Sequence, residues 1–309
     1  MISAIPSDLQ AENPAIITRD LVKYYRKNRA LNGLDLIVPD GAVYLMVGPN
    51  GSGKTTTMKI LLDLIRADSG NAEVFSISPA TRGAEVRASI GYVPEGRIPG
   101  YEWMRVGLLL KHHSSYYPSW DSDYADSLVK KLEIDLRKKF RKLSKGESRR
   151  VQLVMALAHY PPLLLLDEPM DGLDPLARNR VIEILIDYLS ETSATVLAST
   201  HHIQELDKLA DHMGVLFEGK LLAQNRREEI HTSLQRYLLE VPKDWNGAPD
   251  LSNAVVHHDG TGPEISWEIW GDETSVTEKL KAAGAIVRNI VPLRLDEAAV
   301  SILAGKEQE

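Results

Sequence analysis

Apolar residues in the first 225 positions form short uninterrupted runs, separated by longer stretches in which they recur at helical spacing. Val43–Val47 and Leu163–Leu166 are uninterrupted runs, a pattern typical of buried strands. The stretch after the first run predicts a helix whose buried face carries Met58, Leu61, Leu62 and Ile65. Strands that alternate with helices in this way predict an α/β domain.

Weaker patterns complete this part of the chain. Residues 1–14 are expected to be a loose lead-in, and residues 101–160 lack strand-like runs and are expected to be helical. Turn signals stand at 40–41 and 68–70. The remaining strand-like runs are Ala15–Leu21, Leu34–Val38, Thr195–Ser199 and a hairpin over Val215–Ala223 that turns at Glu218-Gly219-Lys220.

The pattern changes beyond about Asn225. Strand-like runs at Tyr237–Val241, Ile265–Ile269 and Ala285–Val291 alternate with helix-like ones at Thr274–Ala283 and Asp296–Leu303, and 242–250 is a loop rich in Pro, Gly and Asp. We therefore expect two domains, an α/β domain over residues 1–224 with a helical part at about 96–160, and a small α+β accessory domain over 225–309 without a chemical motif of its own.

Composition limits the class of protein. The chain has 309 residues, of which 43% are hydrophobic and 26% charged, values that are ordinary for a globular protein. It has no cysteine, which excludes disulfides and thiolate metal sites. Its net charge of −7 argues against a dedicated nucleic-acid binder. No secretory signal is expected, because Asp8 and Glu12 stand near the N-terminus. No run of the ~18 apolar residues needed to span a bilayer is expected either.

The strongest chemical signal follows the first buried strand. Residues 48–56 fit the phosphate-loop spacing G-x-x-x-x-G-K-[ST]. In such a loop, backbone N–H groups and the start of a helix surround a phosphate. Lys54 is expected to reach the β- and γ-phosphates, and the Thr55 hydroxyl to hold Mg²⁺. The alternative is an ordinary glycine-rich turn. The expected nucleotide-binding residues are Gly48, Pro49, Asn50, Gly51, Ser52, Gly53, Lys54, Thr55 and Thr56.

Two carboxylates end the second buried strand. Ligands of open α/β sheets bind at the carboxyl ends of the strands, so Asp167 could hold Mg²⁺ and Glu168 could polarise an attacking water. The alternative is a strand-end turn with two solvated acids. Farther along, Asp174 and Pro175 form a helix-start signal.

Four further features each allow two interpretations. Ser144 and Glu147 form an S-x-x-E capping box, so this helix start is either simply capped or an anion site. His201 follows a buried strand and is either a packed residue or one that faces the same phosphate. Tyr25 lies in a basic cluster that is either a solvated turn or a place where an aromatic ring stacks on a base. Aromatic residues are also concentrated between Tyr101 and Trp120. They either pack in the core or form a surface that binds a partner.

Taken in order, these motifs resemble the ATP-binding subunit of an ABC transporter over roughly residues 15–225. The resemblance implies an α/β P-loop ATPase core of the ABC type with a helical signature subdomain, followed by the small C-terminal α+β domain. It identifies Tyr25 as the adenine contact, 48–56 as Walker A, Gly91–Glu95 as the Q-loop and Leu143–Glu147 as the signature. Walker B is then 163–168, the D-loop lies around Asp174, and His201 is the switch histidine.

The resemblance implies a composite ATPase site between two such subunits, as a homodimer or a heterodimer, with ATP and Mg²⁺ as cofactors. Each ATP then lies between one Walker A and the partner's Ser144, Lys145, Gly146 and Glu147. Glu168 would be the general base, His201 would contact the γ-phosphate, and Asp174 would couple the two sites. The expected metal ligands are Thr55, Asp167 and Glu95.

The chain departs from the family pattern at Lys145 and Glu147, where Gly and Gln are usual, and at Glu95 in place of the Q-loop glutamine. Glu168 and His201 are present, which favours an active site. Residues 116–121 and the Lys-Gly signature are similar to the branch that serves antibiotic, peptide and lipid exporters. That branch implies separate transmembrane subunits, a peripheral location on the cytoplasmic face of the membrane, and no nucleic-acid partner.

Other functions within the same fold are a DNA-repair or chromosome ATPase, a translation factor, and a non-hydrolysing regulatory subunit. The first class carries long coiled-coil or zinc-binding insertions, and the second carries two ATPase units, whereas this chain has short intervals and one set of motifs. An intact Glu168 disfavours the third class.

Overall fold

A six-stranded sheet forms the centre of the computed structural model, which describes residues 14–201, 203–260 and 262–308. Its strand order is β5 (Ile90–Val93), β6 (Leu163–Asp167), β7 (Thr195–Thr200), β3 (Val43–Val47), β8 (His212–Phe217) and β9 (Lys220–Arg226). All neighbours are parallel except the β8–β9 hairpin. The buried strands and the hairpin predicted from the apolar runs are therefore confirmed.

Each central strand contributes to two cores. Leu45 and Leu164 belong to the core on one face of the sheet, and Met46 and Leu165 belong to the core on the other. Because successive side chains of a strand point to opposite faces, only an uninterrupted apolar run can satisfy both cores. The adjoining helices are α1 (Lys54–Leu61), α2 (Pro79–Ala88), α5 (Lys145–Leu157), α6 (Pro175–Thr192) and α7 (Ile203–Leu206).

A three-stranded antiparallel sheet packs beside this body, in the order β2 (Asn28–Pro39), β1 (Pro14–Tyr25) and β4 (Ser69–Val74). Its first two strands are longer than predicted, because a tight turn at Arg26, with φ of 57°, carries the pairing through the basic segment. The turn predicted at 68–70 was wrong, since Ser69 begins β4. A Cβ atom on Gly70 would lie 2.1 Å from the Asp20 carbonyl oxygen, so glycine permits this pairing.

Residues 101–160 are helical as predicted, with α3 (Val106–Ser114), α4 (Ser122–Lys131), η1 (Phe140–Lys142) and α5. The helix after the phosphate loop ends at Leu61, so the prediction that Ile65 lies on it was wrong. Ile65 nevertheless packs against the same core as Met58. The expected lead-in at 1–13 lies outside the described residues, and Pro14 already begins β1.

The C-terminal part is a four-stranded antiparallel sheet ordered β11 (Val255–Asp259), β12 (Glu264–Trp270), β10 (Leu234–Glu240) and β13 (Ile286–Pro292). α8 (Arg227–Ser233), α9 (Glu273–Ala282), α10 (Leu295–Gln308) and η2 (Pro249–Leu251) accompany it. The sequence did not predict β11 and α8, which are short and rich in polar residues.

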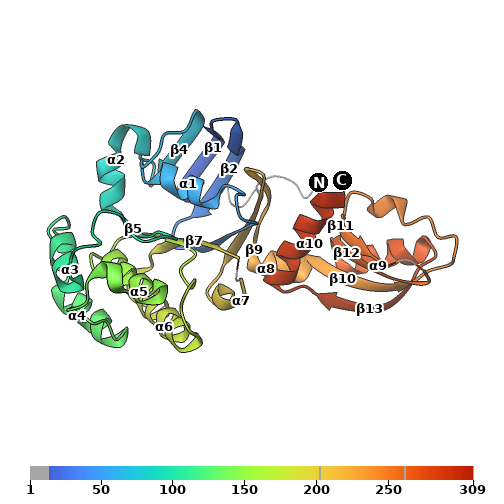
Figure 1. The fold of residues 1–309 in the computed structure, drawn as a ribbon. Helices are drawn as coiled ribbons and strands as arrows, with labels where there is room; N and C mark the ends of the chain where they lie inside the picture. The colour runs from blue at the N-terminus through green and yellow to red at the C-terminus, as the bar shows by residue number, and fades with distance from the viewer. Residues whose placement is uncertain (1–13, 202, 261, 309) are drawn as a thin grey trace.

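The last helix joins the two parts. Ala298, Ala299 and Ile302 of α10 are buried in the core that contains α5 and β6, whereas β10, β12 and α9 form a core of their own. Figure 1 shows α10 between the α/β body and the C-terminal sheet. The division at residue 224 stays a prediction, and α10 indicates that the second unit does not stand apart.

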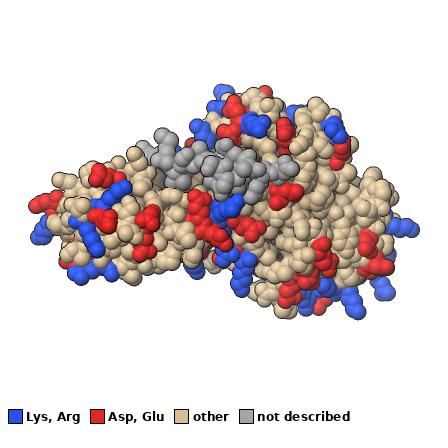
Figure 2. Space-filling model, turned by 180° about the vertical axis from the view of Figure 1, so that it is seen from behind, with Lys and Arg blue, Asp and Glu red and all other residues tan. Residues whose placement is uncertain are grey.

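Two surface properties bear on partners. Among the described residues, no helix has the length and apolarity that crossing a membrane requires. Acidic and basic side chains are interspersed over the described part of the face shown in Figure 2. The expected lack of a nucleic-acid partner stays a prediction.

Candidate functional site

The phosphate loop runs from the end of β3 to the start of α1, as its sequence predicts. Gly53, with φ of 112°, is the N-cap of α1, and a Cβ atom on it would lie 2.8 Å from the Ala30 carbonyl oxygen. The loop is also held from behind, because the Gly219 N–H in the β8–β9 turn donates a 3.0 Å hydrogen bond to the Ser52 carbonyl oxygen. The turn and β2 thus fix the loop against the sheet.

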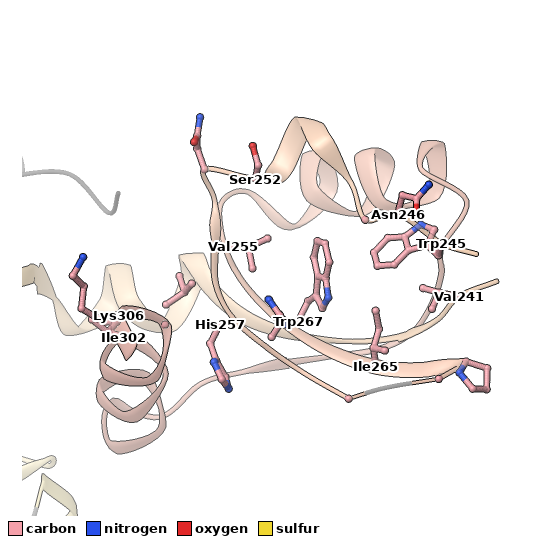
Figure 3. Close-up of a pocket in the computed structure, with 18 of the residues that line it drawn as sticks. Val241, Trp245, Asn246, Ser252, Val255, His257, Ile265, Trp267, Ile302 and Lys306 are labelled. Atoms are coloured by element: carbon pink, nitrogen blue, oxygen red, sulfur yellow. The ribbon is translucent and has the colours of Figure 1, made fainter. Parts of the chain in front are cut away.

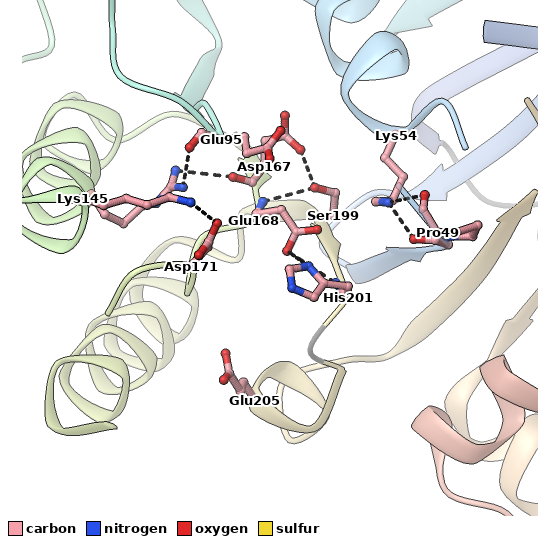
Figure 4. Close-up of polar contacts among 12 residues, drawn as sticks. Pro49, Lys54, Glu95, Lys145, Asp167, Glu168, Asp171, Ser199, His201 and Glu205 are labelled. Carbon is pink, nitrogen blue, oxygen red and sulfur yellow. Dashed lines mark hydrogen bonds and ion pairs between the residues drawn. The ribbon is translucent and has the colours of Figure 1, made fainter. Parts of the chain in front are cut away.

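Lys54 lies within this loop and is only 7% exposed. Its Nζ atom donates hydrogen bonds of 2.7 Å to the Gly48 carbonyl oxygen and 3.1 Å to that of Pro49. Burial lowers the pKa of Lys54, and the carboxylates of Glu168, Asp167 and Glu95 oppose that shift. Figure 4 shows these acids across the site from Lys54. A phosphate bound between Lys54 and these acids would replace the two loop carbonyl oxygens as the hydrogen-bond acceptor of the ammonium group.

The Ser52 hydroxyl oxygen is buried and has no hydrogen-bond partner among the described residues. Thr55 is half-buried in the first turn of α1. An unpaired buried hydroxyl beside a helix N-terminus suits a bound anion, since burial without a partner costs free energy.

Asp167 is the last residue of β6 and is 1% exposed. Its Oδ1 atom accepts a hydrogen bond from the Ser199 hydroxyl of the neighbouring β7, and its buried Oδ2 atom has no partner among the described residues. A buried carboxylate oxygen without a donor fits a cation.

No group of three or more His, Cys, Asp or Glu residues in the described chain is arranged as a metal cage. Glu95 is exposed and lies beside Asp167 at the same edge of the sheet.

Glu168 and His201 are brought together from the ends of adjacent strands. The Glu168 Oε2 atom lies 2.9 Å from His201 Nδ1, and the Glu168 carboxylate is buried. Glu168 has a left-handed φ of 50°, held by hydrogen bonds from its N–H to the carbonyl and hydroxyl oxygens of Ser199. Such backbone strain in a non-glycine residue is typical of functional sites. Asp167 and Glu168 are both buried. The interpretation of the strand end as a turn with two solvated acids is therefore wrong.

The predicted capping box at the signature is confirmed. The Ser144 hydroxyl accepts from the Glu147 N–H at 3.1 Å, and the Ser144 N–H donates to Glu147 Oε2 at 2.7 Å. Lys138 contributes most to lowering the pKa of Glu147, through a 2.7 Å contact. The carboxylate at this position is thus engaged in the cap, while Ser144 and Lys145 remain exposed.

Lys145 forms an ion pair with Asp171 in the turn after Walker B. Gly146 lies close to that turn, since a Cβ atom on it would come within 2.5 Å of the Gly172 carbonyl oxygen. Asp174 caps α6 by accepting from the Ala177 N–H at 2.9 Å, as predicted. Tyr25 stands at the tip of the β1–β2 hairpin, 44% exposed, with Lys23 Nζ 6.0 Å from its ring centre. Both interpretations of Tyr25 remain open.

The sequence reasoning missed Arg149, which is 1% exposed in α5. Its guanidinium donates to the carbonyl oxygens of Pro94, Glu95 and Asp167, the second at 2.8 Å and the third at 3.4 Å. Gln152, one turn later, donates to the Gly96 carbonyl oxygen at 2.7 Å. The available signal in the sequence was the pair Arg149-Arg150, which stands immediately before the apolar residues of this helix.

Comparison with known proteins agrees with this geometry. Residues 31–171 match the family model described as "ABC transporter". The chain is 28% identical over 296 residues to the ABC transporter ATP-binding protein YtrB of Bacillus subtilis, covering 94% of this chain and 98% of YtrB. It is 32% identical to the bacitracin transport ATP-binding protein BcrA of Bacillus licheniformis, covering 79% and 83%. A solved "ATP binding subunit of ABC transporter" superposes with a TM-score of 0.64 at 26% identity, covering 70% of this chain and 92% of that one.

Proposed function

The chain belongs to the ATP-binding subunits of ABC transporters and is an ATPase of that family, and from this premise we propose that it drives export through separate transmembrane subunits. A relative whose name states Nod factor export, 35% identical to this chain, supports the exporter assignment. The proposal includes a peripheral position on the cytoplasmic face of the membrane and a dimer with a second ATPase subunit.

A single observation carries the catalytic assignment. Asp167, Glu168 and His201 stand at the carboxyl ends of two neighbouring strands, facing Lys54 of the phosphate loop. Hydrolysis and nucleotide-dependent dimerisation of the wild type and of a Glu168→Gln variant test it. Retained binding with lost hydrolysis is the expected result.

The reaction proceeds from these positions. Lys54 turns from the loop carbonyls to the β- and γ-phosphates, and the loop N–H groups bind the remaining oxygens. Thr55 and Asp167 would hold Mg²⁺, which supplies charge neutralisation of the phosphates. Water attacks the γ-phosphorus while the bond from that phosphorus to the β–γ bridging oxygen breaks, and ADP leaves with that oxygen. Glu168 accepts the proton of the water, and His201 orients the Glu168 carboxylate and then contacts the γ-phosphate.

A second subunit completes the site. Ser144 and Lys145 begin the 13-residue helix α5 and are exposed to solvent in one chain. A capped helix start that is free on one side is suited to the γ-phosphate bound by a partner's Walker A. The Lys145–Asp171 ion pair connects this surface to the D-loop and to Asp174.

The membrane partner is expected to contact the helical region. Trp103 and Tyr116 are 62% and 64% exposed, whereas Tyr101 packs against the core and beside His112. The structure therefore separates the aromatic residues: Tyr101 has a packing role, and the other two form an exposed candidate surface.

We expect Trp103→Ala and Tyr116→Ala to uncouple hydrolysis from transport while basal ATPase activity survives. Aromatic anchors at interfaces contribute about 2 kcal/mol or more each, which corresponds to roughly a 30-fold weaker complex. Co-purification of the membrane subunits with each variant measures this loss of affinity. Ile186→Ala, which also truncates an exposed apolar residue, is the control, and unchanged co-purification of the aromatic variants would contradict the assignment.

Glu95 is expected to bind Mg²⁺ directly or through water. Without metal, a carboxylate about 4 Å from a phosphate charge costs ~4 kcal/mol at an effective dielectric of ~20, and Mg²⁺ reverses that sign. Glu95→Gln should therefore bind metal-free ATP more tightly than the wild type, and its advantage should shrink as Mg²⁺ saturates. Equal metal-free affinities would show that Glu95 points away from the nucleotide.

A further inference from the structure

A cavity of about 1370 Å³ lies between the β9 hairpin and the C-terminal sheet, away from the nucleotide site. Its apolar lining includes Trp245, Val255, Ile265 and Trp267, none of which is fully buried. Figure 3 shows the side chains of Trp245, Val255, Ile265 and Trp267 around one hollow, with Ile302 of α10 beyond the β11 backbone from Trp267. The two indole rings lie 4.9 Å apart. The hollow is open to solvent on one side and has room for an extended apolar body.

The rim of this cavity is cationic. Lys220 and Lys243 line it, are exposed, and form no ion pair with any described residue. Lys306 also lines it, and no acidic side chain is among the described lining residues. This local charge is opposite to the net charge of −7 of the whole chain. An apolar interior with a positive rim is complementary to an anion with an apolar body.

The cavity wall is connected to the phosphate loop. Lys220, Leu221 and Leu222 of β9 form one wall. The turn that precedes them donates the Gly219 N–H to the Ser52 carbonyl oxygen at 3.0 Å and accepts from the Asn32 N–H at 2.9 Å. A Cβ atom on Gly48 would lie 2.2 Å from the Leu216 carbonyl oxygen of β8. Because the hairpin and the phosphate loop are in such close contact, a displacement of β9 would also displace the Walker A backbone.

We propose that this cavity is a regulatory site for an amphipathic anion, whose apolar body packs on Trp245 and Trp267 and whose negative charge is attracted by the rim lysines Lys220 and Lys243. Occupancy shifts β9 and with it the Gly219–Ser52 contact, so the site changes the affinity of the phosphate loop for ATP. Binding itself does not depend on the proposed function, whereas the coupling to ATP does.

Decanoate below its micelle concentration is a suitable probe, titrated into the full chain while tryptophan fluorescence is followed. We expect saturable quenching that Trp267→Phe reduces and that Trp103→Phe, in the helical region, does not. Decanol and decyltrimethylammonium have the same apolar body without the negative charge, and both should bind at least about tenfold more weakly. Vesicles with an anionic phospholipid distinguish a lipid head group, which causes co-sedimentation, from a free amphiphile, which does not.

Charge reversal tests the rim. Lys243→Glu and Lys220→Glu should each weaken decanoate binding about three- to tenfold, while Lys130→Glu on the exposed face of α4 leaves it unchanged. Because coupling is reciprocal, saturating ATP should change the decanoate affinity by the same factor by which decanoate changes the ATP affinity.

Three outcomes would overturn the proposal. Quenching that the neutral and cationic probes reproduce would show mere apolar adsorption. Binding seen only after removal of residues 1–13, which carry Ile2, Ile5, Asp8 and Glu12, would assign the cavity to that segment. Decanoate binding that leaves the ATP affinity unchanged in an active ATPase would overturn the regulatory role, whereas a chain without ATP binding would instead count against the proposed function.

Discussion

Replacing Glu168 with Gln should lower steady-state ATP hydrolysis by about 10²–10⁴-fold, the usual contribution of a positioned general base. Gln has the same size, so its side-chain oxygen keeps the contact with His201. Removal of one negative charge opposite Lys54 should preserve ATP binding or tighten it. The variant should therefore bind ATP-Mg²⁺ and accumulate as a dimer.

Size-exclusion chromatography with ATP-Mg²⁺ measures the dimer, and phosphate release measures hydrolysis. Glu183→Gln on the exposed side of α6 makes the same chemical change away from the site, and it should behave as the wild type. Wild-type turnover by the Glu168→Gln variant would show that another group takes the proton.

Arg149→Met should both destabilise the protein and impair the ATPase. The substitution leaves the carbonyl oxygens of Pro94, Glu95 and Asp167 without their donor in a buried place. Hydrogen bonds to charged groups contribute about 1.5–3 kcal/mol each, but two of the three are only partly buried and the substitution also removes the cost of burying the charge. We therefore expect a loss of roughly 2–4 kcal/mol in the free energy of unfolding. Thermal and urea unfolding measure this loss.

The charge of Arg149 is separable from its hydrogen bonds. Asp171, Asp167, Glu95 and Glu168 all favour the protonated guanidinium, against the effect of burial, which lowers its pKa. Arg149→Gln removes the compensating charge and should weaken ATP affinity several-fold. Glu95→Gln in the same chain then removes one of the acids and should restore part of that affinity.

Arg150→Gln is the matched control, because Arg150 donates to the Leu132 carbonyl oxygen outside the site. Strictly additive effects of Arg149→Gln and Glu95→Gln on ATP affinity would argue against charge compensation, since residues that interact show coupling. Loss of stability alone would leave Arg149 a packing residue.

Local spacing in the sequence predicted the parts of the site that depend on a few consecutive residues. The phosphate loop, the acids at the end of β6, the capping box at Ser144 and the cap at Asp174 are all present. Each is a short segment whose hydrogen bonds close within a turn or a strand end, so its residue pattern reports its geometry. The same holds for the buried strands, which need apolar side chains on both faces.

Tertiary structure alone decided how those segments meet. The ion pair of Lys145 with Asp171, the position of Arg149 under the Q-loop, and the pairing of β1 with β4 join residues that are distant in sequence. The sequence likewise assigned α10 to the accessory unit, yet Ile302 is buried in the main core. Periodicity shows that a helix has an apolar face and cannot show which surface covers it, because that depends on the packing of the whole chain. The cavity beside β9 arises for the same reason, since elements from both parts of the chain build its walls.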